Sequence, residues 1–92
     1  MINGDLNEFI DKLYYGDELW FVYNGIKYMI QGLYEKGTYN LYLLIPYSEG
    51  TGYTWECKGT ADSYPVKEFL NAPLFENESF MEIEQKIEWV DC

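Results

Sequence analysis

Residues 19–45 read LWFVYNGIKYMIQGLYEKGTYNLYLLI and contain three apolar, aromatic runs joined by two tight-turn signals. The first signal is Asn24-Gly25, which favours a two-residue type I′ turn because both central residues of that turn need a positive φ. A two-residue turn fixes the register of a hairpin, so Leu19 is expected opposite Ile30 on an apolar face.

Lys36-Gly37 is the second turn signal. As a two-residue loop it places Leu43 opposite Ile30, on the face that the first hairpin already selects as apolar. Two independent turns therefore agree on one buried face, which predicts an antiparallel β-meander. The alternative is a Gly bulge at Gly37, which would shift the far hairpin.

Helical spacing marks the N-terminal segment, where Asp5 and Glu8 match a capping box. Apolar residues follow at helical spacing, and Gly16 supplies a stop, so we expect a helix over residues 6–15.

After the meander, residues 53–58 alternate between apolar and polar types, which predicts a fourth, half-buried strand.

Two more helices are expected after the strands. Pro65 favours a short helix at residues 66–70, and Ser79 begins a capping box ahead of a helix over residues 80–90. On that last helix Trp89 would lie roughly opposite the apolar stripe, without a core role. The alternative is that a frayed last turn folds Trp89 back onto the body of the protein.

These elements predict a single domain, residues 1–92, of the α+β class: an antiparallel four-stranded β-meander with one N-terminal and two C-terminal helices, in the order α-β-β-β-β-α-α. A chain this short buries roughly 60–65% of its unfolded surface, which argues against a deep substrate cleft. The expected core consists of Leu19, Phe21, Tyr28, Ile30, Leu41, Leu43 and Ile45, packed against Phe9, Leu13, Phe80, Ile83 and Ile87.

The chain is strongly acidic, with 16 Asp and Glu residues, six Lys, no Arg, no His and a net charge of −10. This composition excludes ordinary nucleic-acid binding, which depends on Lys and Arg. Residues 1–18 carry a net −4 and residues 76–92 a net −5, so the two ends form the acidic surface. Its expected members are Glu8, Asp11, Glu82, Glu84, Glu88 and Asp91.

Catalytic and metal-binding chemistry is poorly represented. Without His and Arg the chain lacks the commonest general base, the commonest metal ligand and the best phosphate clamp. Cys57 and Cys92 do not form a ligand spacing, and a disulfide between them is not favoured. We therefore expect that the protein is not an enzyme and that it binds no cofactor and no metal.

No apolar run is long enough for a membrane span and no leader is recognisable, so we expect a cytoplasmic protein that does not bind membranes.

The same register that builds the core also predicts an apolar patch on the other face of the sheet. Its expected members are Trp20, Val22, Met29, Leu33, Tyr42 and Leu44, and Trp89 is added as an exposed aromatic. Such patches on soluble proteins mark interfaces, so a homodimer or a protein partner could bury this one, with Trp20 as the anchor. The alternative is that residues 64–75 wrap around and cover it.

Two stretches carry a resemblance to known sequences. The first runs from Gly16 to Tyr28, with its Gly-Asp-Glu-Leu start and the Asn24-Gly25 hairpin, and the second from Ser79 to Trp89. They resemble uncharacterised small acidic proteins of low-GC Gram-positive bacteria and their mobile elements. The resemblance implies a small accessory protein, and it carries over no functional residue.

These observations predict a non-catalytic interaction module of the inhibitor, immunity or adaptor type, which binds a basic surface of a protein partner. One alternative is a phage-type anti-defence protein whose carboxylates imitate DNA phosphates. The other is a small-ligand-binding domain that uses the Tyr-rich sheet as a stacking platform.

The charge distribution generates a first prediction. Added NaCl should raise the melting temperature at neutral pH, because like charges crowd the two ends of the chain and screening relieves their repulsion. Thermal unfolding followed by circular dichroism at increasing NaCl measures this. A melting temperature that falls with salt would mean that the carboxylates are paired with the six Lys.

Overall fold

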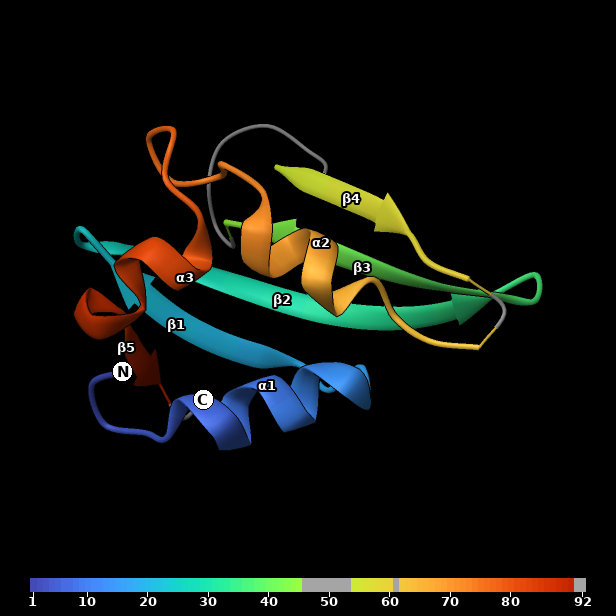
Figure 1. Cartoon of the computed structure of the whole chain (residues 1–92), viewed down its shortest axis with the longest axis horizontal. Coiled ribbons are helices and arrows are strands. Elements are labelled where there is room, and N and C mark those ends of the chain that lie inside the picture. The colour runs from blue at the N-terminus through green and yellow to red at the C-terminus, as the bar shows by residue number, and fades with distance from the viewer. Residues whose placement is uncertain (46–53, 61, 91–92) are drawn as a thin grey trace.

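The computed structural model describes residues 1–45, 54–60 and 62–90. These residues form an antiparallel five-stranded sheet in the spatial order β4-β3-β2-β1-β5 (Figure 1). The strands are β1 (Leu19–Tyr23), β2 (Ile26–Glu35), β3 (Thr38–Leu44), β4 (Trp55–Lys58) and β5 (Glu88–Val90). The helices are α1 (Leu6–Tyr14), α2 (Val66–Asn71) and α3 (Phe80–Ile83), followed by the 3-10 helix η1 (Glu84–Lys86).

Two left-handed turns set the register of the three central strands. Asn24 and Gly25 have φ values of 54° and 75°, and Lys36 and Gly37 have values of 50° and 79°. Positive φ at both central residues is the type I′ requirement, and it confirms the two-residue loops. Leu19 pairs with Ile30 and Ile30 with Leu43, as predicted, and the alternative of a bulge at Gly37 is wrong.

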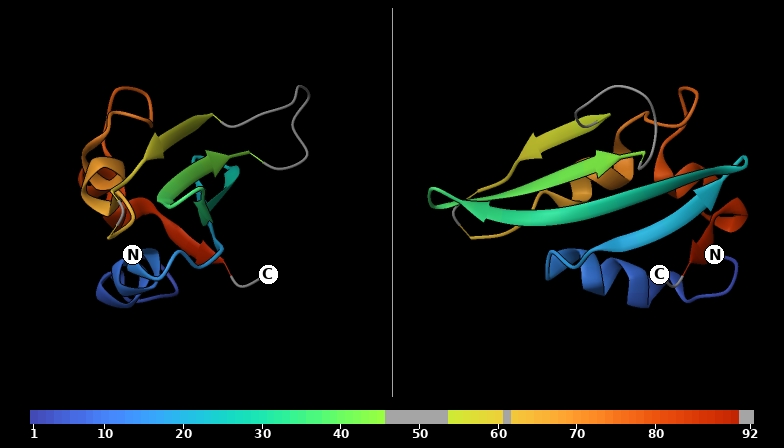
Figure 2. Two further views of the ribbon diagram at one scale, coloured as in Figure 1. Left: turned by 90° about the vertical axis from the view of Figure 1, so that its right-hand side faces the viewer. Right: turned by 180° about the vertical axis from the view of Figure 1, so that it is seen from behind.

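The helices lie on one side of the sheet (Figure 2). Asp5 caps α1 by accepting a hydrogen bond from the Asn7 N–H (3.3 Å). Rings from all three helices meet the sheet there: Phe9 of α1 and Phe80 of α3 lie 6.0 and 5.5 Å from the ring of Phe21, and Phe69 of α2 lies 5.8 Å from the ring of Trp55 on β4. We call this side the core face.

The predicted core is confirmed except for one residue, Ile45, which is only partly buried. The segment from Val66 to Phe75 adds to it four side chains that the sequence pattern did not assign, namely Val66, Phe69, Leu70 and Phe75. The Phe75 ring lies 5.9 Å from Phe21 and 5.3 Å from Tyr28. The idea that residues 64–75 cover the opposite face is therefore wrong.

A glycine inside β2 is explained by a close approach on the core face. The Tyr64 ring lies against Gly32, and a Cβ on Gly32 would come within 2.5 Å of that ring and 2.6 Å of Gly16 Cα. The Gly32 N–H also donates to the Gly16 carbonyl (3.1 Å).

Burial raises the pKa of the Tyr64 hydroxyl, with smaller contributions from Tyr39 and Asp17.

The expected helix over residues 80–90 is wrong. The predicted capping box is present, since Ser79 Oγ accepts from the Glu82 N–H (3.3 Å) and Glu82 Oε1 accepts from the Ser79 N–H (2.9 Å). The helix nevertheless ends at Ile83, and after η1 the chain becomes β5. The fold is therefore α+β with a fifth strand where part of the last helix was expected.

β5 fills the edge of the sheet beside β1. Phe21 pairs with Trp89 across this ladder. On the other side of β5, Ile2 forms a parallel bridge: its N–H donates to the Ile87 carbonyl (2.8 Å) and its carbonyl accepts from the Trp89 N–H (2.8 Å). The backbone groups of a strand need partners, and β1 obtains them here from a segment far along the chain.

The register generates a second prediction. Ile30→Ala should lower the free energy of unfolding by about 2–5 kcal/mol, because Ile30 is fully buried on the core face. Ile26→Ala, on the same strand but 40% exposed, is the matched control and should cost about 1 kcal/mol or less. Urea denaturation measures both. An unmoved midpoint for Ile30→Ala would show that this register is wrong.

Candidate protein-interaction surface

The sheet face opposite the helices carries an apolar row. Val90, Trp20, Met29 and Leu44 are register neighbours across four adjacent strands. We call this side of the sheet the open face, because none of the helices in the described part of the chain packs on it. All four residues are half-buried by their neighbours.

The open face holds six of the seven side chains predicted as the interaction patch: Trp20, Val22, Met29, Leu33, Tyr42 and Leu44. Val90 joins them. It was not among the predicted patch residues, because the pattern of residues 80–90 favours a helix. Charged side chains border the apolar row on the same face or beside it, namely Glu18, Glu35, Glu56, Glu88, Lys27, Lys36 and Lys58. Four carboxylates against three ammonium groups leave this border with a small excess of negative charge.

Trp20 is held in place by two neighbours. Its indole N–H donates to Glu18 Oε1 (2.8 Å), and Lys27 Nζ lies 4.9 Å from the ring centroid. The second contact is a cation–π interaction, which aromatic rings make with ammonium groups at this distance. Trp20 is thus oriented by contacts within the chain.

Trp89, the seventh predicted patch residue, lies apart from the other six. As part of β5 it points to the core face, where its ring makes an edge-to-face contact with Phe9 (centroids 5.3 Å apart, interplanar angle 87°). Gly4 passes directly over the indole, and a Cβ there would collide with it. The alternative that Trp89 folds back onto the body is confirmed, although by strand pairing rather than by a frayed helix.

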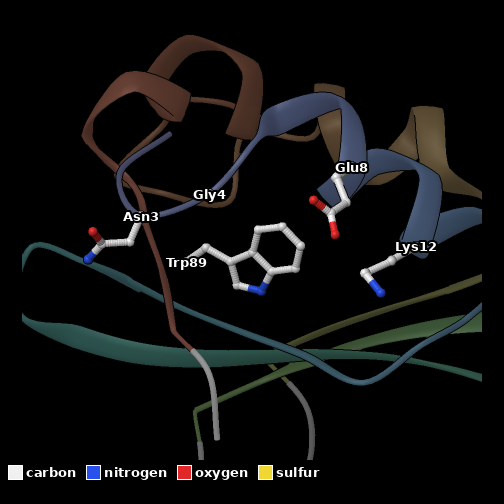
Figure 3. A pocket seen from close by; sticks show the side chains of 5 residues that line it. All are labelled: Asn3, Gly4, Glu8, Lys12 and Trp89. Atoms are coloured by element: carbon white, nitrogen blue, oxygen red, sulfur yellow. The ribbon is translucent and has the colours of Figure 1, made fainter.

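Two adjoining cavities surround the outer side of Trp89. The first, about 360 Å³, is lined by Trp89 with Asn3 and Gly4 on one side and Glu8 and Lys12 of α1 on the other (Figure 3). The second, about 350 Å³, shares Lys12 and Trp89. It is also lined by Asp17, Glu18 and Leu19, and it extends to Trp20 and Val90 on the open face. Together the two cavities form a cleft that ends beside Trp20. The lining of this cleft has more carboxylates than ammonium groups.

The residues predicted as one acidic surface are divided among several places. Glu8 and Asp11 are exposed on α1, and the Glu82 carboxylate caps α3. Glu84 Oε2 lies 3.1 Å from the ammonium group of Met1, and Glu88 Oε2 accepts from the Asn3 side chain at 2.6 Å. Asp91 lies outside the described residues. Within residues 1–45, 54–60 and 62–90, no Lys forms an ion pair with a carboxylate.

Cys57 offers no reactive thiolate. It is half-buried on β4, and burial raises the pKa of its thiol, with a smaller contribution from the negative charge of Glu68. A raised pKa keeps the thiol protonated at neutral pH, and the protonated form is a poor nucleophile. Cys92 lies outside the described residues.

In comparisons with known proteins, no family model, no curated protein and no solved structure matches this chain. In the part of the chain that the structure describes, no group of three or more Cys, Asp and Glu side chains could hold a metal ion. None of the described helices has the length and apolar character needed to cross a bilayer.

The two faces of β1 generate a third prediction. Trp20→Ala should give a folded protein that loses about 1 kcal/mol or less, because Trp20 is half-buried on the open face. Phe21→Ala, the adjacent residue, should lose about 3–5 kcal/mol, because Phe21 is fully buried on the core face. Chemical denaturation of both variants is the measurement. Equal losses would mean that the face holding Trp20 is a second core.

Proposed function

We propose that this protein is a non-catalytic interaction module whose open face binds a basic surface of a protein partner, as an inhibitor, an immunity protein or an adaptor would. The observation that supports this most directly is the row of Val90, Trp20, Met29 and Leu44 across four strands, on a face that none of the described helices covers. Contiguous apolar surface of this kind is typical of protein interfaces.

The border of the open face supports a partner of opposite charge. Interfaces commonly combine an apolar centre with a polar rim, and complementary charges speed the encounter of the two surfaces. The rim here has an excess of carboxylates, in a chain whose net charge is −10. A second copy of the chain would carry the same negative charge, so electrostatics favours a basic partner over a homodimer.

Trp20 is suited to be the anchor of this interface. Trp residues are enriched among the side chains that contribute most to binding. The hydrogen bond to Glu18 and the contact with Lys27 restrict the indole in the unbound protein, so little rotamer entropy remains to be lost on binding.

A capture experiment with paired variants tests the proposal and gives the fourth prediction. Immobilised wild-type chain and its Met29→Lys and Met81→Lys variants are each mixed with a lysate of the source cells at about 50 mM NaCl. Met29 lies in the apolar row, whereas Met81 is 42% exposed on α3, on the opposite side of the molecule. The two substitutions change the net charge equally, so a difference between them reports the location.

We expect a basic protein that wild type and Met81→Lys retain, that Met29→Lys loses, and that about 300 mM NaCl releases. Identical retention by all three chains would overturn the proposal, as would retention that does not change with salt. Displacement of the captured protein by duplex DNA would identify the partner as a nucleic-acid-binding protein and the carboxylates as phosphate mimics.

A further inference from the structure

Asn40 on β3 is a polar side chain buried on the open face. It is only 7% exposed, and its register neighbours are Leu33 on β2 and Lys58 on β4. Its Oδ1 atom is shielded from solvent and is the one buried side-chain nitrogen or oxygen in the described residues without a hydrogen-bond partner. By contrast Ser79, which is equally buried, has its hydroxyl engaged in the cap of α3.

An unpartnered buried acceptor lowers the stability of the isolated protein, because the atom has lost its contact with water and gained nothing in return. Such atoms are rare in folded proteins, and each one calls for an explanation. Here the atom lies on the same face as the proposed interface, which points to a group supplied from outside the chain.

A cavity of about 220 Å³ adjoins Asn40 on this face, and its other lining residues are Glu35, Lys36, Thr38, Tyr42 and Lys58. Two ammonium groups against one carboxylate give this cavity a local positive charge, unlike the rest of the open face. A cationic donor would be repelled here. A neutral amide or hydroxyl group would not.

We propose that Asn40 Oδ1 accepts a hydrogen bond from a neutral side-chain amide or hydroxyl of the bound protein, which occupies this cavity. The inference rests on the proposed function and adds to it a specificity-determining position. Lys58, which lines this cavity, has an exposed and unbranched side chain, so it can change rotamer when a donor group enters the cavity. Rotamer changes of this kind are common when interfaces form.

The fifth prediction concerns three variants of the full chain. Asn40→Leu keeps the approximate size of the side chain and removes the unpartnered acceptor, so the melting temperature of the unbound protein should rise by roughly 4–8 °C. The same variant should bind the protein captured by wild type about tenfold more weakly, because the partner's donor is left unpaired. Asn40→Asp keeps the acceptor and should bind more tightly than Asn40→Leu.

Asn7→Leu is the matched control, since Asn7 is exposed on α1 and distant from the open face, and it should change neither quantity. If Asn40→Leu lowers the melting temperature, the amide is already satisfied in the unbound protein and the inference is overturned. It is also overturned if Asn40→Leu binds as wild type does while Met29→Lys does not, an outcome that leaves the proposed function standing. If Met29→Lys binds normally, both fall.

Discussion

The whole structure depends on two pairs of residues held in the left-handed conformation. Asn24-Gly25 and Lys36-Gly37 each close a hairpin with no spare residue, and this fixes which side chains of the central strands share a face. Because alternate residues point to opposite sides, one extra residue in either loop would exchange the core side chains of the adjoining hairpin for its outward ones. The turns therefore determine both the packing and the surface that is left over.

The assignment of alternate side chains to opposite faces of the sheet explains how a chain of 92 residues forms both a core and an apolar outer face. Phe9, Phe21, Phe75 and Phe80 fill the core face, and each ring contacts at least two of the others, so few residues enclose a large apolar volume. All three helices are used on that side. In the part of the chain that the structure describes, no further helix remains to cover Trp20 and Met29. The open face is the consequence.

The meander, its register and most of the core could be predicted because turn chemistry and side-chain alternation agree locally. The end of the chain could not, because residues 80–90 fit two periods: Phe80, Ile83 and Ile87 suit a helix, whereas Ile87 and Trp89 also alternate as in a strand. The deciding factor was the unpaired edge of β1, which is far away in sequence. Trp89 had no place on the helical stripe, and that misfit was the available signal. Nothing local distinguishes Asn40, whose register neighbours Leu33 and Lys58 lie on two other strands.

The placement of β5 has a consequence for synthesis on the ribosome. β1 is complete at Tyr23, but the strand that occupies its outer edge begins about 65 residues later, at Glu88. At a translation rate of roughly 5–20 residues per second, β5 is synthesised about 3–13 s after β1, and the outer edge of β1 has no partner strand during this time. During that interval the nascent chain exposes unpaired backbone groups beside Trp20 and Val22, a combination that favours pairing with other chains. Rapid protection of this edge by a chaperone would therefore increase the yield of folded protein.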